Sequence, residues 1–194
     1  MKSFNIAAYI SGSGSNLRAV IDSSLSGYIS SKVRLVIANK EVSGLDHPKE
    51  LGIETAVVSR ELMTRKEFLD VQIRLLEKHG IDLIILAGFL KKLPPEIVVK
   101  YQGRILNIHP ALLPKFGGKG MHGMTVHRAV VAAGEKFSGP TVHFVDNKYD
   151  NGEILIQRKL ELAEDETAET LQKKVLEVEH IIYPEAIKLL EERE

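Results

Sequence analysis

The run "IDLIILAGFL" at residues 81–90 is almost wholly apolar and is interrupted only by Asp82. A strand with one wet face would alternate apolar and polar residues, and residues 82–89 do not. A continuous apolar run is typical of a parallel strand that helices cover on both faces. The run is half the ~20 residues that a membrane-spanning helix needs. We therefore predict a buried central strand here and no membrane segment.

On both sides of this run, short apolar stretches alternate with amphipathic ones. The helix predicted at 64–80 has the clearest pattern, because Phe68, Val71 and Leu75 recur at helical spacing. Alternating strands and helices predict the α/β class, with a doubly wound and mostly parallel sheet. Further strands are expected at 4–10, 32–39, 54–59 and 104–110, and further helices at 16–25 and 94–101.

The pattern changes after residue 139. Strands are predicted at 140–145 and 152–160, joined by "DNKYDNG" (146–152). An Asp-Asn-Gly sequence favours a hairpin or a close antiparallel return. A C-terminal helix is expected over 169–182, disturbed at Pro184. A length of 194 residues fits one domain, so residues 1–194 are expected to form a single unit.

Composition narrows the class of partner. Lys+Arg and Asp+Glu both number 26, so the net charge of zero gives no case for nucleic acid or an anionic membrane. The absence of cysteine excludes disulfides and thiolate metal sites, and it is compatible with a reducing cytoplasm. The chain passes from "MKSF" directly into a strand pattern, so no signal peptide is expected. These features favour a cytoplasmic protein with small-molecule partners.

The first turn, "SGSGSN" (11–16), is a candidate phosphate site. Its glycines let the backbone approach a ligand, and the N–H groups that open the next helix attract an anion. Ser15 or Asn16 is expected to cap that helix. A tight turn without a ligand is the alternative. Leu17 stands where a dinucleotide fingerprint needs its third glycine, and no acid ends "IANK" (37–40), so one phosphate monoester is favoured over a dinucleotide.

The strand end "ILNIHPALLP" (105–114) carries two polar groups. Asn107 and His109 share one face of the strand, and Pro110 places them at its carboxyl-end rim, where ligands of such sheets bind. An amide and an imidazole side by side can hold a developing oxyanion and move a proton. A buried polar pair satisfied by backbone is the alternative. Asp150 is the preferred candidate to orient His109, although an Asp in such a turn often only shapes it.

These pieces together resemble the glycinamide ribonucleotide formyltransferase family, folate-dependent enzymes of purine biosynthesis. The resemblance implies a Rossmann-like formyltransferase fold over 1–194. It also implies transfer of the formyl group of 10-formyltetrahydrofolate to the amine of 5'-phosphoribosylglycinamide. The matching segments follow the family's order along nearly the whole chain: "ISGSGSNL" (10–17), "ILAGFLKKL" (85–93), "GRILNIHPALLPKF" (103–116), "VHFVDNKYDNG" (142–152) and "EHIIYP" (179–184).

The resemblance also implies roles for individual residues. The catalytic residues would be Asn107, His109 and Asp150. The ribonucleotide would bind through its phosphate to Gly14, Ser15 and Asn16 and through its ribose hydroxyls to Glu179. The residues implied for folate binding are Arg65, Leu90, Lys91, Lys92, Leu93 and Asn107. The loop at 145–150 would close the pterin pocket. No metal is expected, and the chain is expected to act as a monomer or homodimer.

Some alternatives stay open at this point. A formyltetrahydrofolate hydrolase would use the same three catalytic residues, with water in place of the amine. A phosphate sensor with an inactive site is the non-catalytic alternative. The connection at 117–125 is longer than in some relatives. His127 is expected to be structural or to start a helix, and His143 either supports the site or is a satisfied core histidine.

Overall fold

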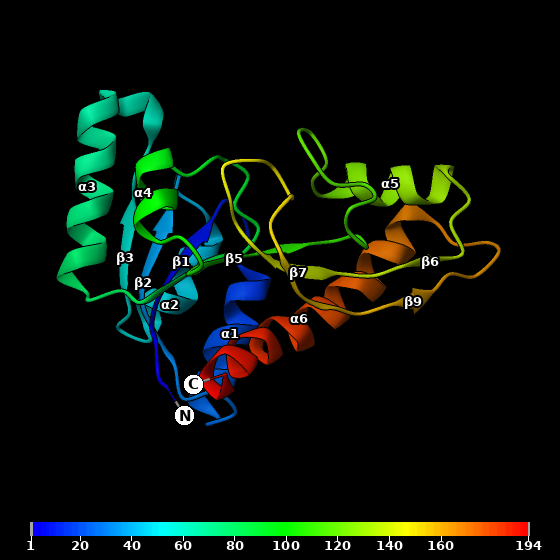
Figure 1. Cartoon of the computed structure of the whole chain (residues 1–194), viewed down its shortest axis with the longest axis horizontal. Helices are drawn as coiled ribbons and strands as arrows, with labels where there is room; N and C mark the ends of the chain where they lie inside the picture. The colour runs from blue at the N-terminus through cyan, green and yellow to red at the C-terminus, as the bar shows by residue number, and fades with distance from the viewer. Residues whose placement is uncertain (1, 194) are drawn as a thin grey trace.

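The computed structural model describes residues 2–193 and has a seven-stranded central sheet in the order β3-β2-β1-β4-β5-β7-β8 (Figure 1). Strands β3, β2, β1, β4 and β5 run parallel to one another. Strands β7 and β8 continue the sheet, and each pairs antiparallel with the strand before it. A separate two-stranded sheet pairs β6 with β9. The strands are β1 (Asn5–Ile10), β2 (Lys32–Ala38), β3 (Glu54–Val57), β4 (Leu83–Leu86), β5 (Ile105–His109), β6 (Phe137–Ser138), β7 (Thr141–Phe144), β8 (Ile154–Gln157) and β9 (Leu160–Glu161).

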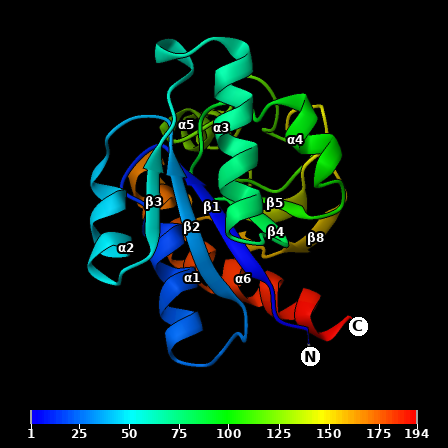
Figure 2. The same ribbon diagram turned by 90° about the vertical axis from the view of Figure 1, so that its left-hand side faces the viewer.

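Helices cover both faces of the sheet (Figure 2). One face packs against α1 (Ser15–Leu25) and α6 (Ala168–Glu192), with α2 (Asp46–Glu50) beside α1. The other face packs against α3 (Arg65–Lys78) and α4 (Pro95–Lys100). Helix α5 (Met124–Ala132) packs on the first part of α6 in a third, smaller cluster. The predicted doubly wound sheet is confirmed, and across residues 2–193 no helix is both long and apolar enough to cross a membrane.

The predicted central strand is β4, and all four of its residues are buried. It pairs with β1 on one side and β5 on the other. The chain winds from β1 through β2 to β3 in one direction and from β4 to β5 in the other. The order therefore reverses between β1 and β4, which opens a crevice at their carboxyl ends.

Two predictions about the second half of the chain are wrong in detail. Helix α6 continues through Pro184 to Glu192 rather than being disturbed there. Proline inside a helix costs ~3 kcal/mol or more, but Tyr183, Ala186 and Ile187 around it are fully buried against the sheet, and that packing offsets the cost. The predicted strand at 152–160 is divided, because β8 pairs with β7 while β9 turns away to pair with β6.

The predicted cap of α1 is also wrong. The N-cap residue is Gly14, with φ of 71°, and no side chain caps it. The amide of Asn16 lies inside the first turn and bonds elsewhere, to Glu179 of α6. Helices α2 and α5 were not predicted as elements. Helix α2 has only five residues and contains Pro48, and α5 has nine residues directly after the glycine-rich stretch 117–123, so neither shows a clear helical period.

Candidate active site

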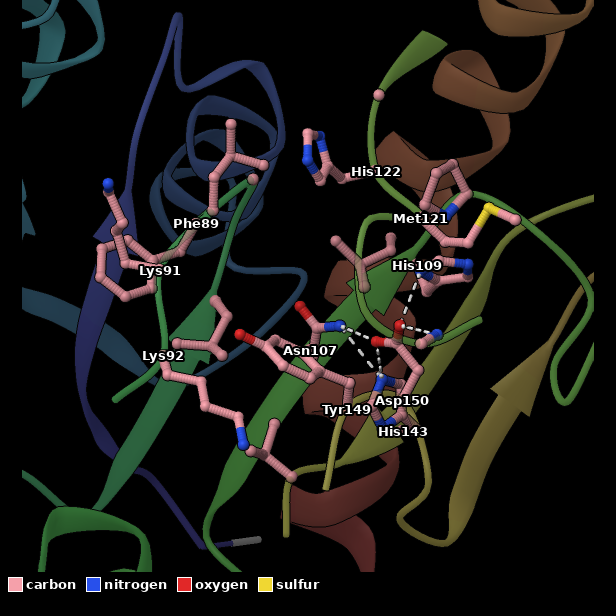
Figure 3. A pocket seen from close by; sticks show the side chains of 18 of the residues that line it. Phe89, Lys91, Lys92, Asn107, His109, Met121, His122, His143, Tyr149 and Asp150 are labelled. Carbon is pink, nitrogen blue, oxygen red and sulfur yellow. Dashed lines mark hydrogen bonds and ion pairs between the residues drawn. The ribbon is translucent and has the colours of Figure 1, made fainter. Parts of the chain in front are cut away.

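A cavity of about 510 Å³ lies at the carboxyl ends of β4 and β5. The segments that follow these strands form its walls, together with the loop after β7, the segment before α5 and part of α6. In open α/β sheets, ligands bind at this edge. Asn107, His109 and Asp150 all line the cavity, with the Asp150 carboxylate turned toward the other two (Figure 3). The three residues implied as catalytic therefore share one site.

Strand β5 fixes the amide and the imidazole. Asn107 and His109 lie on one face, as predicted, while Leu106 and Ile108 pack into the core on the side of α1 and α6. The strand is paired on both sides, with β4 and with β7. The backbone that carries the two polar side chains is therefore held rigidly.

His109 is held at both ring nitrogens. Its Nε2 lies 2.8 Å from the carbonyl oxygen of Phe116, and because a carbonyl only accepts, Nε2 carries a proton. Its Nδ1 lies 3.7 Å from Oδ2 of Asp150. Burial holds the pKa of His109 below its ordinary value, although Asp150 and the Phe116 carbonyl raise it in part, and the nearby His143 ring lowers it further. A protonated His109 would satisfy both neighbours, and neither nitrogen faces the cavity unengaged.

Asp150 accepts from several donors. The Gly118 N–H donates to Oδ2 at 2.8 Å, and Asn107 Nδ2 lies 3.4 Å from Oδ1. Burial alone would raise the pKa of this carboxyl, but His143, the Gly118 N–H and His109 together hold the pKa below its ordinary value. The carboxylate is therefore ionised at neutral pH. Its backbone φ of 49° is left-handed, a conformation that Asp and Asn adopt more readily than most residues.

The nitrogen of the Asn107 amide points away from the cavity. Nδ2 lies 3.0 Å from Nε2 of His143, which is opposite Asn107 across the β5–β7 pair. His143 Nδ1 lies 2.8 Å from the Phe144 carbonyl oxygen and must donate to it, so Nε2 of the neutral ring is an acceptor. The Asn107 oxygen points the opposite way from His143 and Asp150 (Figure 3). In this conformation both amide hydrogens are directed at protein groups.

At another end of the cavity, Asn16 and Glu179 form a buried pair. Asn16 Nδ2 donates to Oε2 of Glu179 at 2.7 Å. Burial raises the pKa of Glu179 to about 7, although the hydrogen bond from Asn16 lowers it. Asn16 Oδ1 is buried without a hydrogen-bond partner among the described residues. A buried acceptor without a partner is costly, so this end suits a ligand that presents hydroxyl or N–H donors.

Of the three residues implied for phosphate binding, Asn16 lines the cavity, while Gly14 and Ser15 lie next to it at the start of α1. The N–H groups of a helix's first turn have no intrahelical partner and attract anions. A Cβ atom on Gly14 would lie 3.1 Å from Cα of Gly44, so the turn is tightly packed as well as left-handed. The loop can therefore present backbone donors beside the Asn16–Glu179 pair.

The residues implied for folate binding divide between two cavities. Leu90 to Leu93 line the main cavity, with Phe89 (Figure 3). Arg65 does not line it and instead borders a second cavity of about 550 Å³, where it pairs with Glu96 at 2.8 Å. Phe89 and the segment 91–93 line both cavities, which are therefore neighbours.

The loop after β7 meets the segment implied for folate binding through Lys92. Its Nζ donates to the Asn147 carbonyl at 3.1 Å and lies 4.5 Å from the centre of the Tyr149 ring. Residues 145–150 all line the cavity, so Lys92 links two of its walls. The Leu90 N–H donates to the Ser11 hydroxyl, so this backbone donor is already used within the fold.

Comparison with known proteins identifies the family. The family model for formyl transferases matches residues 4–187. The chain belongs to the formyl transferase family. A phosphoribosylglycinamide formyltransferase of Haemophilus influenzae is 38% identical over 185 residues, which cover 94% of this chain and 85% of that protein. The crystal structure of glycinamide ribonucleotide transformylase 1 from Symbiobacterium toebii is 35% identical, covers 98% of this chain and 88% of its own, and superposes with a TM-score of 0.90.

Other relatives are longer than this chain. A chloroplastic phosphoribosylglycinamide formyltransferase of Arabidopsis thaliana is 40% identical over 196 residues, but this chain spans only 66% of its length. A formyltetrahydrofolate deformylase from Pseudomonas syringae pv. tomato is 20% identical with a TM-score of 0.83. That last likeness concerns the fold alone.

Sequence reasoning left several contacts in this site unassigned. Phe116 and Gly118 hold His109 and Asp150 through their backbones, which no residue type reveals. The role of His143 was left open. The alternation of side chains along β7 could have assigned it to the site, but only if the β5–β7 register had been known. His127 is buried in α5 and lines the cavity, and its Nδ1 has no partner among the described residues. Within residues 2–193, no group of three or more His, Cys, Asp or Glu side chains could hold a metal ion.

The raised pKa of Glu179 predicts how stability depends on pH. A rise from 4.5 to about 7 means that the folded protein pays nothing for this group below pH 4.5, and that the penalty grows until about pH 7. The full penalty is about 3 kcal/mol. We expect Glu179→Gln to raise the free energy of unfolding by up to that amount near pH 8 and to change it little near pH 4.5. Denaturant unfolding at both pH values measures this, and an equal effect at both would contradict it.

Proposed function

We propose that this chain transfers the formyl group of 10-formyltetrahydrofolate to the amine of 5'-phosphoribosylglycinamide. The observation that supports this most strongly is one cavity with two chemically different ends. At one end are Asn16 and Glu179 beside a helix N-terminus, and at another are Phe89 and the segment 90–93. Asn107, His109 and Asp150 also line this cavity, as a site that joins two substrates requires.

The folate end is the apolar one. A pterin would lie between the segment 90–93 and the loop 145–150, which Lys92 links. The aminobenzoyl-glutamate part would then extend into the second cavity, where Arg65 and Lys91 offer positive charge to its carboxylates. Arg65 would exchange its exposed partner Glu96 for the ligand, and exposed ion pairs of that kind are weak, ~0–1 kcal/mol.

In the proposed reaction, the amine nitrogen attacks the formyl carbon and the C=O electrons move to oxygen. Burial leaves the pKa of the free His109 below its ordinary value, and the ionised Asp150 opposes that lowering. His109 would therefore become protonated as negative charge develops on the oxygen, and its cation would stabilise the oxyanion. Asn107 would donate an N–H to the same oxygen once its amide turns from the observed orientation, in which both hydrogens face His143 and Asp150. The amine loses a proton, N10 of the folate gains one, and the C–N10 bond breaks. Because both nitrogens of His109 are engaged, we route the proton through an ordered water.

The decisive experiment is formyl transfer by the purified protein with each substrate omitted in turn. We expect tetrahydrofolate to form only when both substrates are present. Formate release from 10-formyltetrahydrofolate without the ribonucleotide would favour the hydrolase instead. No turnover with either set of substrates, from a protein that binds the ribonucleotide, would favour a sensor.

Ser15→Ala tests the phosphate loop. The serine hydroxyl stands at the first position of α1, where a phosphate would lie, and the substitution leaves the left-handed Gly14 in place. We expect KM for phosphoribosylglycinamide to rise about tenfold, the value of one lost charge-assisted hydrogen bond, with kcat and KM for the folate nearly unchanged. Steady-state kinetics with each substrate varied separately measures this. An unchanged KM would reduce the loop to a turn.

A further inference from the structure

His143 lies beneath the catalytic amide and is almost fully buried, with a side chain 2% exposed. Its Nδ1 donates to the Phe144 carbonyl, which leaves Nε2 as the only nitrogen that can change its role. That nitrogen is 3.0 Å from Asn107 Nδ2 and 3.6 Å from Asp150 Oδ1. The ring therefore touches two of the three residues to which the proposed mechanism assigns a role.

The observed arrangement is self-consistent but unsuited to an oxyanion. With Nε2 unprotonated, Asn107 must offer its N–H groups to His143 and Asp150, because the carbonyl end would meet two acceptors there. The carbonyl oxygen then faces away from both (Figure 3). Turning the amide about Cβ–Cγ would lose both contacts and bring an oxygen against a carboxylate, so the neutral ring opposes the turn.

A proton on Nε2 reverses this preference. The Nε2–H could then donate to the Asn107 oxygen and pair with Asp150, and the Asn107 N–H groups would face the opposite side, toward the substrates. We propose that His143 is a positioning residue that sets which end of the Asn107 amide faces the cavity, with the oxygen inward when Nε2 is unprotonated and the N–H inward when it is protonated. The inference deepens the proposed function and rests on it for its kinetic consequence.

The groups that act on His143 electrostatically come from two places. Asp150 and Asp146, on the loop after β7, favour the protonated ring, and a protonated His109 on β5 disfavours it. A charged His109 held by Asp150 therefore competes with His143 for the same carboxylate. Both rings lie beside this one carboxylate, at 3.7 Å for His109 Nδ1 and 3.6 Å for His143 Nε2.

A direct test uses the substrate-free protein and does not depend on the reaction. Proton–nitrogen correlation spectra of the labelled protein report the tautomer of each histidine ring. We expect His143 in the Nδ1–H tautomer at high pH, and protection of the Asn107 side-chain amide protons that weakens as pH falls. An Nε2–H tautomer for the neutral ring would overturn the inference even if the protein transfers formyl groups.

Two variants connect the orientation to turnover. His143→Leu removes the titrating nitrogen while keeping the volume, and His143→Gln keeps a group that can either donate or accept at any pH. We expect His143→Leu to lower kcat about 10- to 100-fold at low pH and less at high pH, with KM values nearly unchanged, because the turned amide loses its donor. His143→Gln is expected to recover part of kcat with a flatter pH profile.

Ionisation of the substrate amine affects the kcat of wild-type and variant protein equally. It therefore cancels when the two kcat values are divided at each pH. His180→Asn, a histidine of α6 outside the cavity, serves as the matched control, and its ratio should stay near one at all pH values. A His143→Leu ratio that is constant with pH would contradict the proposed turn. If wild-type protein transfers no formyl group, the proposed function fails, while the tautomer result still decides the amide orientation.

Discussion

Asp150→Asn should lower kcat for formyl transfer by about 10³- to 10⁴-fold while the protein stays folded, the loss seen when a carboxylate that orients a histidine becomes an amide. The substitution is nearly isosteric, and asparagine tolerates the φ of 49° at this position. Asparagine can still accept from the Gly118 N–H. The backbone loop should therefore keep its shape.

The reason for the large loss is charge. Asp150 is the carboxylate beside both His109 Nδ1 and His143 Nε2, at 3.7 and 3.6 Å. Without it, burial lowers the pKa of His109 with less opposition, so the ring is less able to take up a proton as the oxyanion forms. The asparagine side chain would also place either an N–H or a C=O beside the rings of His109 and His143. That group would then decide which nitrogen of each ring carries the proton. The cation that stabilises the oxyanion then forms less readily.

Measurement of kcat and both KM values, with Tm as the fold check, tests this. Asp146→Asn is the informative comparison, because Asp146 belongs to the same loop but is exposed and bonds within the loop, to the Lys148 N–H and Asn151. We expect a loss below about tenfold for it. Equal losses for the two variants would mean that the loop's shape, and not the Asp150 charge, supports turnover.

Fold class was readable from the sequence because a buried parallel strand leaves a strong pattern. The apolar run around β4 and the helical period of α3 each predict one element, and their alternation predicts the winding. The interior of α6 was misread at Pro184 because propensity is local, while the burial of Tyr183 and Ile187 that overrides it comes from a distant sheet. Tertiary packing decided that element.

The candidate site was readable only in part, for a similar reason. Strand alternation placed Asn107 and His109 on one face, and a turn motif marked Asp150. The donors and acceptors that fix their orientation could not be read in this way, because the Phe116 carbonyl and the Gly118 N–H are backbone groups and His143 depends on register. The sequence therefore predicted which side chains meet, whereas the directions of their hydrogen bonds are seen only in the structure.

Asn107→Ala is the second variant with a large expected effect. Removing one oxyanion donor typically lowers kcat about 10²- to 10³-fold, equivalent to about 2.7–4 kcal/mol of transition-state stabilisation. The amide also satisfies His143 Nε2 and contacts Asp150 Oδ1, so its loss leaves a buried acceptor without a partner, which costs ~1–3 kcal/mol of stability. We therefore expect a lower Tm together with the lower kcat.

Asn107→Leu is the control for the side-chain volume that Asn107→Ala removes. Leucine fills the volume of the amide beside His143 but offers no N–H, so it removes the donor without opening a cavity. If the amide acts on the oxyanion, both variants should lose kcat to a similar extent while their KM values for the folate stay within a few-fold, because the interaction forms only in the transition state. Near-normal kcat in a folded Asn107→Leu protein would remove this amide from the chemistry. A loss confined to KM would assign Asn107 to binding of the folate instead.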